Sequence, residues 1–594
     1  MQYRYKCVTL QKIMIMKQEE DILMLPNGIS DFRKVRMGGY CYVDKTMYLN
    51  DLERAGSYLF FVRPRRFGKS LFISMMKDYY DCLNASNFQE EFKGLAVAKK
   101  PTKWQGKFQI IHFDFSMVAG MAGNTIEEKF NTYCCGVLDK FIRDYADYYT
   151  PEIVNAVLAE KGQGEKLLAI TREAKTLHHL IYLIVDEYDN FTNTILSNDK
   201  DRYGKLTHDE GYYRTVFKLY KPNFDRIIMF GVSPVTLNDI TSSYNIPTNI
   251  SARTAFNGLL GFSEVEIKKI ISYYRKSGLI KNSTKDIMND MRPWYDNYCF
   301  TKNAFKDGNG IYNPYMVLNY LDTLIKEGTA PENMVVSNTA TDITKLQQII
   351  DIDINNSHFG NSQLQKIVLD GYVYDSLYAD FDALKMTRDE YFSSVLYYQG
   401  MLTIGGARGE RLKLIIPNLN ARAQYYDYMR YMYNSRDHLR ISDLKDVLEG
   451  AAYDGKWQSL IEFLGSHYKN DSSIRDAIEG ERHLQGYFLA YLKLTSLFIT
   501  WPEMELNHGY GDFFLFANTK KYPDAKHSYI IELKYLQKGK SQAEADAQIE
   551  EATAQLRRYA ADKDVRALTA GTNLHLIAVQ MRGEELVKYI SVED

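Results

Sequence analysis

The sequence predicts an α/β protein with a parallel sheet in its N-terminal half and a smaller α/β domain at its C-terminus. Two observations predict the parallel sheet. An apolar strand runs into a loop that ends in Gly68-Lys69-Ser70, and a second apolar strand, residues 180–185, ends in Asp186 and Glu187. A third observation predicts the C-terminal domain, because an aspartate, a loop and the tripeptide Glu532-Leu533-Lys534 follow one another across a predicted hairpin.

The loop after the first strand has the layout of a phosphate-binding site. Residues 60–62 are apolar, and residues 71–80 behind the loop can form a helix. In such a loop the N–H groups at the helix N-terminus face the phosphates, Lys69 reaches the β/γ oxygens and Ser70 reaches Mg²⁺. The usual pattern has glycine at the position of Arg63, so a basic loop that caps a helix is the alternative. We assign nucleotide binding to Arg63, Arg65, Arg66, Phe67, Gly68, Lys69 and Ser70, and we expect at least one of the three arginines to contact phosphate or an acidic neighbour.

The acidic end of the second strand supports the phosphate site. Acidic residues at the carboxyl end of a central strand lie where open α/β sheets bind ligands. Asp186 would hold Mg²⁺ through water, and Glu187 would polarise the attacking water. An acidic strand-to-loop turn is the alternative, but the two motifs in this order favour a P-loop ATPase. Ser233, after a third apolar strand, could sense the γ-phosphate, although the local pattern favours a simple Ser-Pro turn. Residues 110–116 are a further expected strand.

The region after the ATPase core is predicted to be mostly helical. Residues 256–330 form the expected helical lid, in which Ser263 and Glu266 have the spacing of a capping box. Residues 331–425 combine helices with a hairpin, in which residues 401–404 and 412–416 are the strands and residues 405–410 the turn. This combination is typical of a winged helix, which binds DNA in some proteins and serves as a spacer or dimer contact in others. Arg408 and Arg411 on the hairpin add modest support for DNA.

The C-terminal region, residues 426–594, contains the second set of candidate catalytic residues. Because side chains alternate on a strand, Glu532 and Lys534 share one face. An aspartate followed by Glu-x-Lys across a hairpin is typical of the restriction-endonuclease-like core. Carboxylate oxygens there would hold Mg²⁺ or Mn²⁺, and Lys534 would orient the attacking water. Asp512 and Glu532 are the expected metal ligands, Glu481 or Glu505 would complete the shell, and Gln555 and Tyr559 match a Gln-x-x-x-Tyr pattern on the next helix. If Glu532 and Lys534 are considered without the other motif residues, the alternative to a metal site is an ion pair on a solvent-exposed face of the strand.

The chain resembles bacterial and archaeal AAA-ATPase-like proteins that carry a C-terminal PD-(D/E)XK nuclease-like domain. The resemblance begins near Leu25, so residues 1–24 are an expected extension and residues 25–255 the expected ATPase core. It implies that Arg63 is a family trait, whereas Asn297 stands where the family usually has glycine and Gly511 where the nuclease motif has proline. The matching segments are residues 28–32, 42–46, 63–70, 185–189, 230–235, 294–298 and 312–314.

Bulk composition fits a multidomain globular protein. The chain has 594 residues, 45% hydrophobic and 25% charged, with a formal net charge of -2. A nucleic-acid partner would therefore need a local positive surface. The six cysteines show no metal spacing, which favours a reduced, cytoplasmic protein. No apolar run approaches the length of a membrane span, so no membrane partner is expected. The tyrosine pairs on predicted helices fit either core packing, the more usual role, or base stacking.

Together these features predict an enzyme that binds and hydrolyses ATP with Mg²⁺ and couples it to a metal-dependent nuclease acting on DNA. The main alternative is a nucleotide-controlled switch whose C-terminal domain binds nucleic acid or a protein without cleaving. A third possibility, degenerate sites in an interaction scaffold, is disfavoured because all four metal-site positions are retained. A homo-oligomer is compatible with either of the first two.

Overall fold

The computed structural model describes residues 22–190, 223–234, 248–335, 363–378, 389–434, 440–470, 481–506, 509–519 and 521–592. Some side chains within these ranges, those of Glu505 and Asp512 among them, lie outside the description. The chain divides into two compact units. The first, called the N-unit here, comprises Met1–Thr341 with Tyr374–Asn418, and the second, the C-unit, comprises Asp342–Val373 with Leu419–Asp594.

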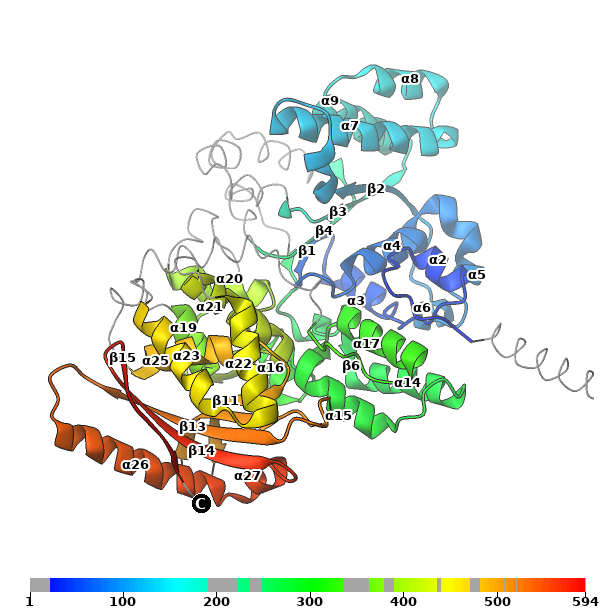
Figure 1. Ribbon diagram of the computed structural model, residues 1–594. Helices are drawn as coiled ribbons and strands as arrows, with labels where there is room; N and C mark the ends of the chain where they lie inside the picture. Colours follow the sequence, from blue (N-terminus) through cyan, green and yellow to red (C-terminus); the bar gives the residue numbers. More distant parts are fainter. Residues whose placement is uncertain are drawn as a thin grey trace, which may run out of the picture. The chain divides into compact units, whose positions relative to one another are not determined.

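A five-stranded parallel sheet forms the centre of the N-unit (Figure 1). Its order is β2-β3-β4-β1-β5, so β4 separates the strand that precedes the phosphate loop from the strand that ends in Asp186. The apolar runs predicted as strands are buried here because parallel strands are covered on both faces. The strands are β1 (Tyr58–Val62), β2 (Phe108–Asp114), β3 (Leu180–Asp186), β4 (Arg226–Gly231) and β5 (Thr248–Asn249).

Helices surround this sheet, and the predicted helix after the loop is α4 (Lys69–Tyr80). Near β2 and β3 lie α7, which starts in a capping box of Thr125 and Glu128, and α9 (Figure 1). Besides α4, the α-helices of this part are α2 (Phe32–Met37), α3 (Tyr48–Ala55), α5 (Phe88–Glu91), α6 (Ala96–Lys99), α7 (Ile126–Asp144), α8 (Pro151–Ala159) and α9 (Gln163–Thr176). The 3₁₀ turns are η1 (Cys82–Asn87), η2 (Phe115–Gly120), η3 (Ala146–Tyr148) and η5 (Thr254–Phe256).

A helical subdomain follows, as predicted. The capping box at Ser263 and Glu266 is confirmed, because the Ser263 hydroxyl accepts from the Glu266 N–H and the Glu266 carboxylate accepts from the Ser263 N–H. Asn297 has a φ of 80°, a left-handed conformation that glycine adopts freely and asparagine tolerates. This explains the Gly-to-Asn difference from the family pattern. The elements are β6 (Phe262–Ser263), α14 (Glu264–Lys276), α15 (Thr284–Tyr295), α16 (Lys302–Lys306), β7 (Ile311–Tyr312) and α17 (Pro314–Glu327).

The predicted hairpin forms, but with a shorter turn than expected. Its strands are β9 (Thr403–Arg408) and β10 (Arg411–Ile415), which follow α20 (Asp389–Tyr398) and pair in a sheet of order β8-β10-β9 with β8 (Tyr372–Asp375). The expectation of a turn over residues 405–410 is therefore wrong, because the turn is Gly409-Glu410 alone. Gly405 belongs to β9, where a Cβ would come within 2.5 Å of the Ile415 side chain, so close packing rather than a turn requires glycine there.

The C-unit contains helices and a mixed five-stranded sheet of order β11-β12-β13-β14-β15. Only the β13–β14 pair is parallel among the pairs of this sheet. Helix α26 packs on β13 and β14, and its apolar residues share a core with Phe514 and Ile530. The elements are α19 (Gln363–Asp370), α21 (Leu419–Asn434), α22 (Ile441–Asp454), α23 (Trp457–Asn470), α25 (Glu481–Leu492), β11 (Phe498–Leu506), β12 (Gly509–Ala517), β13 (His527–Leu536), α26 (Gln542–Ala560), α27 (Lys563–Leu568), β14 (Asn573–Arg582) and β15 (Glu585–Val592).

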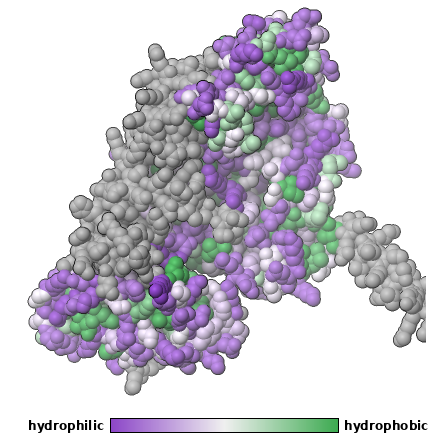
Figure 2. Space-filling model, turned by 45° about the horizontal axis from the view of Figure 1, so that its top comes forward, coloured by the Kyte–Doolittle hydropathy of each residue, from purple (hydrophilic) through white to green (hydrophobic). Residues whose placement is uncertain are grey.

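Hydrophilic residues predominate on the coloured part of the face in Figure 2, with hydrophobic residues in smaller patches. Over the described ranges, the structure contains no helix long and apolar enough to cross a membrane. Tyr79, Tyr80 and Tyr274 are fully buried, in agreement with core packing of these tyrosines, whereas Tyr212 and Tyr213 lie outside the described residues.

Candidate functional site

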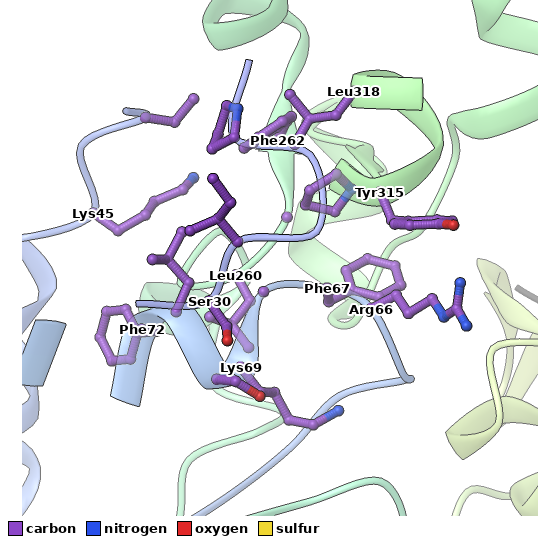
Figure 3. A pocket seen from close by; sticks show the side chains of 18 of the residues that line it. Ser30, Lys45, Arg66, Phe67, Lys69, Phe72, Leu260, Phe262, Tyr315 and Leu318 are labelled. Carbon is purple, nitrogen blue, oxygen red and sulfur yellow. The ribbon is translucent and has the colours of Figure 1, made fainter. Parts of the chain in front are cut away.

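A cavity of about 520 Å³ lies over the phosphate loop of the N-unit (Figure 3). Its volume is in the range of small-molecule sites. Figure 3 shows Phe262 and Leu318 grouped at the end of the cavity opposite Lys69. The end opposite Lys69 therefore combines these apolar side chains with Lys45, and the end at the phosphate loop is basic at Lys69. The walls come from residues 26–30, from Cys41, Tyr42, Val43 and Lys45, from residues 65–72, from Glu187, from residues 259–262 and Ile270, and from Pro314, Tyr315 and Leu318.

Lys69 provides the cation at the base of the cavity. Its Nζ donates hydrogen bonds to the carbonyl oxygens of Arg63 and Pro64, at 3.0 and 3.1 Å. Burial lowers the pKa of Lys69, while Asp186 and neighbouring acids oppose this effect. Gly68, with a φ of 98°, turns the loop into α4 in a conformation that favours glycine. Phosphate oxygens can replace the two carbonyls as acceptors for Lys69.

Ser70 and Asp186 bring two oxygen ligands together beside Lys69. The Ser70 hydroxyl lies 3.5 Å from Asp186 Oδ2. Burial raises the pKa of Asp186 to about 7, and Lys69 opposes the shift while Asp114, its register partner on β2, adds to it. A buried carboxylate near other acids is stabilised by a cation. Hard oxygens are the ligands that Mg²⁺ prefers, so the residues fit the expected ion.

Glu187 follows Asp186 and lines the cavity. It has a φ of 47°, a left-handed conformation that is uncommon for non-glycine residues and that occurs at functional sites. Burial raises the pKa of its carboxyl group, and Lys69 and Arg65 oppose the shift. Glu187 is therefore close enough to the loop to interact with its cations.

Ser233 lies at the end of β4 and is not among the cavity-lining residues of the described chain. Its N–H donates to Asp189 Oδ2 at 3.0 Å, and its carbonyl accepts from the Tyr188 hydroxyl. These contacts join the ends of β3 and β4. A role as γ-phosphate sensor stays a prediction.

Arg63 points into the protein rather than into the cavity. Its guanidinium donates to the carbonyls of Val62 and Ser251, each at 2.9 Å, and of Phe256 at 3.0 Å. It also lies over the rings of Phe61 and Phe300, 4.4 and 4.0 Å from the ring centroids. Burial lowers its pKa to about 10. Arg63 does not line the cavity, so the geometry favours a role in holding the loop over the direct nucleotide contact expected from the sequence.

Replacing Arg63 with lysine is expected to lower the free energy of unfolding by roughly 2–3 kcal/mol, because a lysine cannot satisfy three buried carbonyls in a fork. Thermal and denaturant unfolding measure this change. Arg66→Lys is the matched control, since Arg66 is exposed in the same loop and should change stability by less than about 0.5 kcal/mol. Equal stability of the two variants would contradict the role given to Arg63.

Arg65, Arg66 and Phe67 do line the cavity. The Arg66 guanidinium lies 4.5 Å from the centroid of the Tyr315 ring, where α17 begins (Figure 3). Phe67 accepts a hydrogen bond from the Gly261 N–H and packs edge-on against Tyr298. Loop and helical subdomain are thus directly connected.

Sequence reasoning gave no site role to residues 26–30 or to Lys45. Lys45 is buried and pairs with Glu266 of α14, Nζ to Oε1 at 2.8 Å. It also donates to the Gly258 carbonyl. Their local sequence looks like that of an ordinary turn. The sequence marks them only as part of the segments, residues 28–32 and 42–46, that match the family pattern.

The C-unit contains a buried ion pair at the predicted second site. Glu532 and Lys534 on β13 are separated by 3.2 Å, with side-chain exposures of 4% and 11%. The solvated ion pair considered as an alternative is therefore excluded. Side chains alternate along a strand, so both residues lie on the same face of β13 as Ile530, which belongs to the core shared with α26. Burying such a pair is costly unless further charges or ligands compensate.

Glu481, at the start of α25, lies near this pair. Burial raises its pKa, and Lys534 and the Tyr535 N–H, which hydrogen-bonds to it, oppose the shift. Glu481 also lines a cavity of about 560 Å³ whose other walls include Lys540, Glu544, Gln548 and Glu551. Glu532 and Lys534 do not line this cavity, so it lies beside the pair.

Gln555 and Tyr559 occupy different environments on α26. Tyr559 is 2% exposed and belongs to the apolar core, where it packs against Phe514. Gln555 is half-buried, and its Oε1 has no hydrogen-bond partner within the described part of the chain. Gln555 follows Glu551 by one helical turn, which puts it on the helix face that lines the cavity.

The expected ligands Asp512 and Glu505 are described by backbone only. Phe513 pairs with Ile531 across β12 and β13, so Asp512 and Glu532 are the next residues along two adjacent strands. Their side-chain convergence stays a prediction. Among the described side chains, no cluster of three or more His, Cys, Asp or Glu residues could hold a metal.

Two family models match separate parts of the chain. Residues 26–241 match a family model described as predicted AAA-ATPase, and residues 479–589 match the PD-(D/E)XK nuclease superfamily. An uncharacterized protein from the vnfD 5' region of Azotobacter chroococcum mcd 1 is 25% identical over 305 residues, which span 50% of this chain and 51% of that protein. The Aeropyrum pernix ORC2 protein, solved with ADPNP and ADP, is 11% identical with a TM-score of 0.29, over 65% of this chain and 90% of that one.

Proposed function

Since the chain carries an AAA-ATPase-like domain and, at its C-terminus, a PD-(D/E)XK nuclease superfamily domain, we propose that it hydrolyses ATP and couples hydrolysis to metal-dependent cleavage of DNA. The observation that carries the proposal is the cavity over the phosphate loop, which has a basic end at Lys69 and an acidic residue, Glu187, in its wall. A structural loop alone would not need a ligand-sized cavity at this place.

In the proposed ATPase reaction, the cavity orients the nucleotide and the loop neutralises its charge. The apolar wall holds the base, the N–H groups at the start of α4 face the phosphates, and Lys69 stabilises negative charge on the β/γ oxygens. Glu187 accepts a hydrogen bond from the attacking water and aligns it with the γ-phosphate. Ser70 and Asp186 would hold Mg²⁺, which supplies further positive charge when bound.

In the proposed nuclease reaction, Lys534 orients the attacking water and stabilises charge on the scissile phosphate. Glu532, Asp512 and either Glu481 or Glu505 would hold a divalent cation, Mg²⁺ or Mn²⁺, which activates the water when bound. The buried Glu532–Lys534 pair supports this proposal, because its burial is costly in a purely structural strand. Gln555 would assist from α26.

The alternative, a nucleotide-controlled switch whose C-terminal domain only binds nucleic acid or a protein, uses the same ATP site. We also propose that the chain forms a homo-oligomer. Light scattering with and without ATP measures its molar mass in solution and tests this.

Glu187→Gln is expected to bind ATP like the wild type but to hydrolyse it roughly 100- to 1,000-fold more slowly, because the amide cannot act as a base for the attacking water. Calorimetry gives the affinity, and phosphate release gives the turnover rate. The control is Glu160→Gln, an exposed glutamate after α8. Unchanged turnover in Glu187→Gln would show that another residue aligns the water.

A further inference from the structure

The β9–β10 hairpin has two arginines directly opposite each other at its tip. Arg408 ends β9 and Arg411 begins β10, and the two are register partners. Gly409 has a φ of 61°, as a type II′ turn requires at its first central position. Like charges directly opposite on an antiparallel pair are destabilising. A hairpin with a purely structural role would not favour this pair.

Within the described part of the chain, no acidic side chain neutralises either arginine. Both are exposed, and within the described ranges neither guanidinium has a salt-bridge or hydrogen-bond partner. The hairpin turn contributes one acidic residue, Glu410, which is exposed as well. The two charges are therefore available to an anion from outside the chain.

Helix α16 extends this positive surface. Lys302 and Lys306 are exposed on α16, and Phe305 between them is 37% exposed. The Phe305 ring lies 3.8 Å from the position that a Cβ of Gly406 would occupy. Helix α16 thus packs against β9, and Gly406 precedes Arg408 by two residues on that strand. The hairpin surface is defined here as Lys302, Phe305, Lys306, Arg408 and Arg411.

The base of the hairpin is connected to the phosphate loop inside the N-unit. The Cys299 N–H donates to the Thr403 hydroxyl at 2.7 Å, and the Ile404 N–H donates to the Cys299 carbonyl at 3.2 Å. The neighbouring Phe300 lies under the Arg63 guanidinium. Two residues, Cys299 and Phe300, therefore connect the base of the hairpin to the Arg63 side chain.

We propose that the hairpin surface binds the phosphate backbone of double-stranded DNA and that this contact regulates ATP hydrolysis. The proposal rests on the proposed function, which supplies DNA as the partner. The hairpin surface has four positively charged side chains, and Asp307 and Glu410 are the acidic residues next to them in the sequence. The surface is therefore locally positive, although the whole chain has a net charge of -2. Arginine forks fit phosphate oxygens in a bidentate manner. The contact is with the backbone, so it is independent of base sequence.

The test is DNA binding by full-length Arg408→Gln/Arg411→Gln. Fluorescence anisotropy with a labelled duplex, in EDTA and without ATP, gives the affinity over a series of NaCl concentrations. Each lost phosphate contact should reduce the slope of log K against log salt by about 0.9, so the double variant should lose about 1.8 and bind roughly tenfold more weakly. DNA-stimulated ATP hydrolysis should fall in parallel.

Arg54→Gln/Arg143→Gln is the matched control, because both arginines are exposed and the charge change is the same. The control should keep the wild-type slope, and thermal melts of both variants check folding. If the wild type binds DNA and the hairpin variant keeps its slope, or if the control loses slope equally, the hairpin proposal is wrong while DNA stays the partner. If the wild type binds no duplex, the hairpin proposal is also wrong. The proposed function fails with it only if single-stranded and branched DNA are not bound either.

Discussion

Lys69→Ala is expected to weaken ATP binding by roughly 10- to 100-fold. The Lys69 ammonium is buried at the basic end of the cavity and is already held by two carbonyl acceptors of the loop. Hydrogen bonds to charged groups contribute about 1.5–3 kcal/mol, and each 1.4 kcal/mol is a factor of ten in affinity. Isothermal titration calorimetry with Mg²⁺ and ATP measures the change, and hydrolysis should fall with it.

Removal of Lys69 also leaves Asp186 without its nearest cation, so folding needs a separate check. Lys69→Gln keeps a polar side chain of similar length, and a thermal melt of both variants distinguishes a binding defect from unfolding. Lys99→Ala, at the exposed end of α6, is the control for loss of one positive charge. Equal ATP affinity in wild type and both folded Lys69 variants would remove the basis of the nucleotide site.

Lys534→Ala is expected to reduce DNA cleavage by at least about 100-fold and to leave ATP hydrolysis largely intact. Loss of one group that stabilises charge in a transition state typically costs this much. Lys534 and the cavity over the phosphate loop lie in separate units, so the ATPase rate should change little. A gel-based cleavage assay and a phosphate-release assay on the same preparation measure both.

The Lys534 substitution leaves the buried Glu532 carboxylate without its partner, which destabilises the C-unit. Asp512→Ala is therefore a second variant, and it should abolish cleavage by loss of a metal ligand. Lys563→Ala, on exposed α27, is the control. Full cleavage by a folded Lys534→Ala or Asp512→Ala protein would show that the cut is made elsewhere.

The sheet and the loop of the N-unit were predictable because their signals are local. A parallel strand covered on both faces is a continuous apolar run, as residues 180–185 are, and the residues of the phosphate-loop pattern follow the first strand directly. The role of Arg63 was not predictable in this way. Its acceptors at Ser251 and Phe256 are 188 and 193 residues away, and the sequence shows no sign that they meet.

The walls of the cavity were missed for the same reason. Lys45 and Glu266 form an ion pair across more than 200 residues, and the local sequence around each gives no sign of it.

The hairpin turn was misplaced for a different reason. Gly405 and Gly406 look like turn residues, but Gly405 is required by the close approach of Ile415 across the strands. Once the turn is shortened, Arg408 and Arg411 become direct neighbours.

The C-terminal site was predicted in part. Period-2 alternation correctly placed Glu532 and Lys534 on one face of β13, but not their burial, which depends on the packing of α25 and α26. Tyr559 was included as a site residue on its spacing from Gln555. The structure places it in the apolar core against Phe514, one turn further along the same helix face.

The most direct test of the central claim, ATP-coupled and metal-dependent DNA cleavage, is one cleavage assay on the wild-type protein. Linear, circular, branched and single-stranded DNA are incubated with Mg²⁺ or Mn²⁺, with and without ATP, and with EDTA as the metal-free control. The account predicts that at least one DNA form is cut, that EDTA abolishes the cut, and that ATP changes its rate. If every form stays intact with either metal, with and without ATP, the C-terminal domain is a binding module and the account of a nuclease is contradicted.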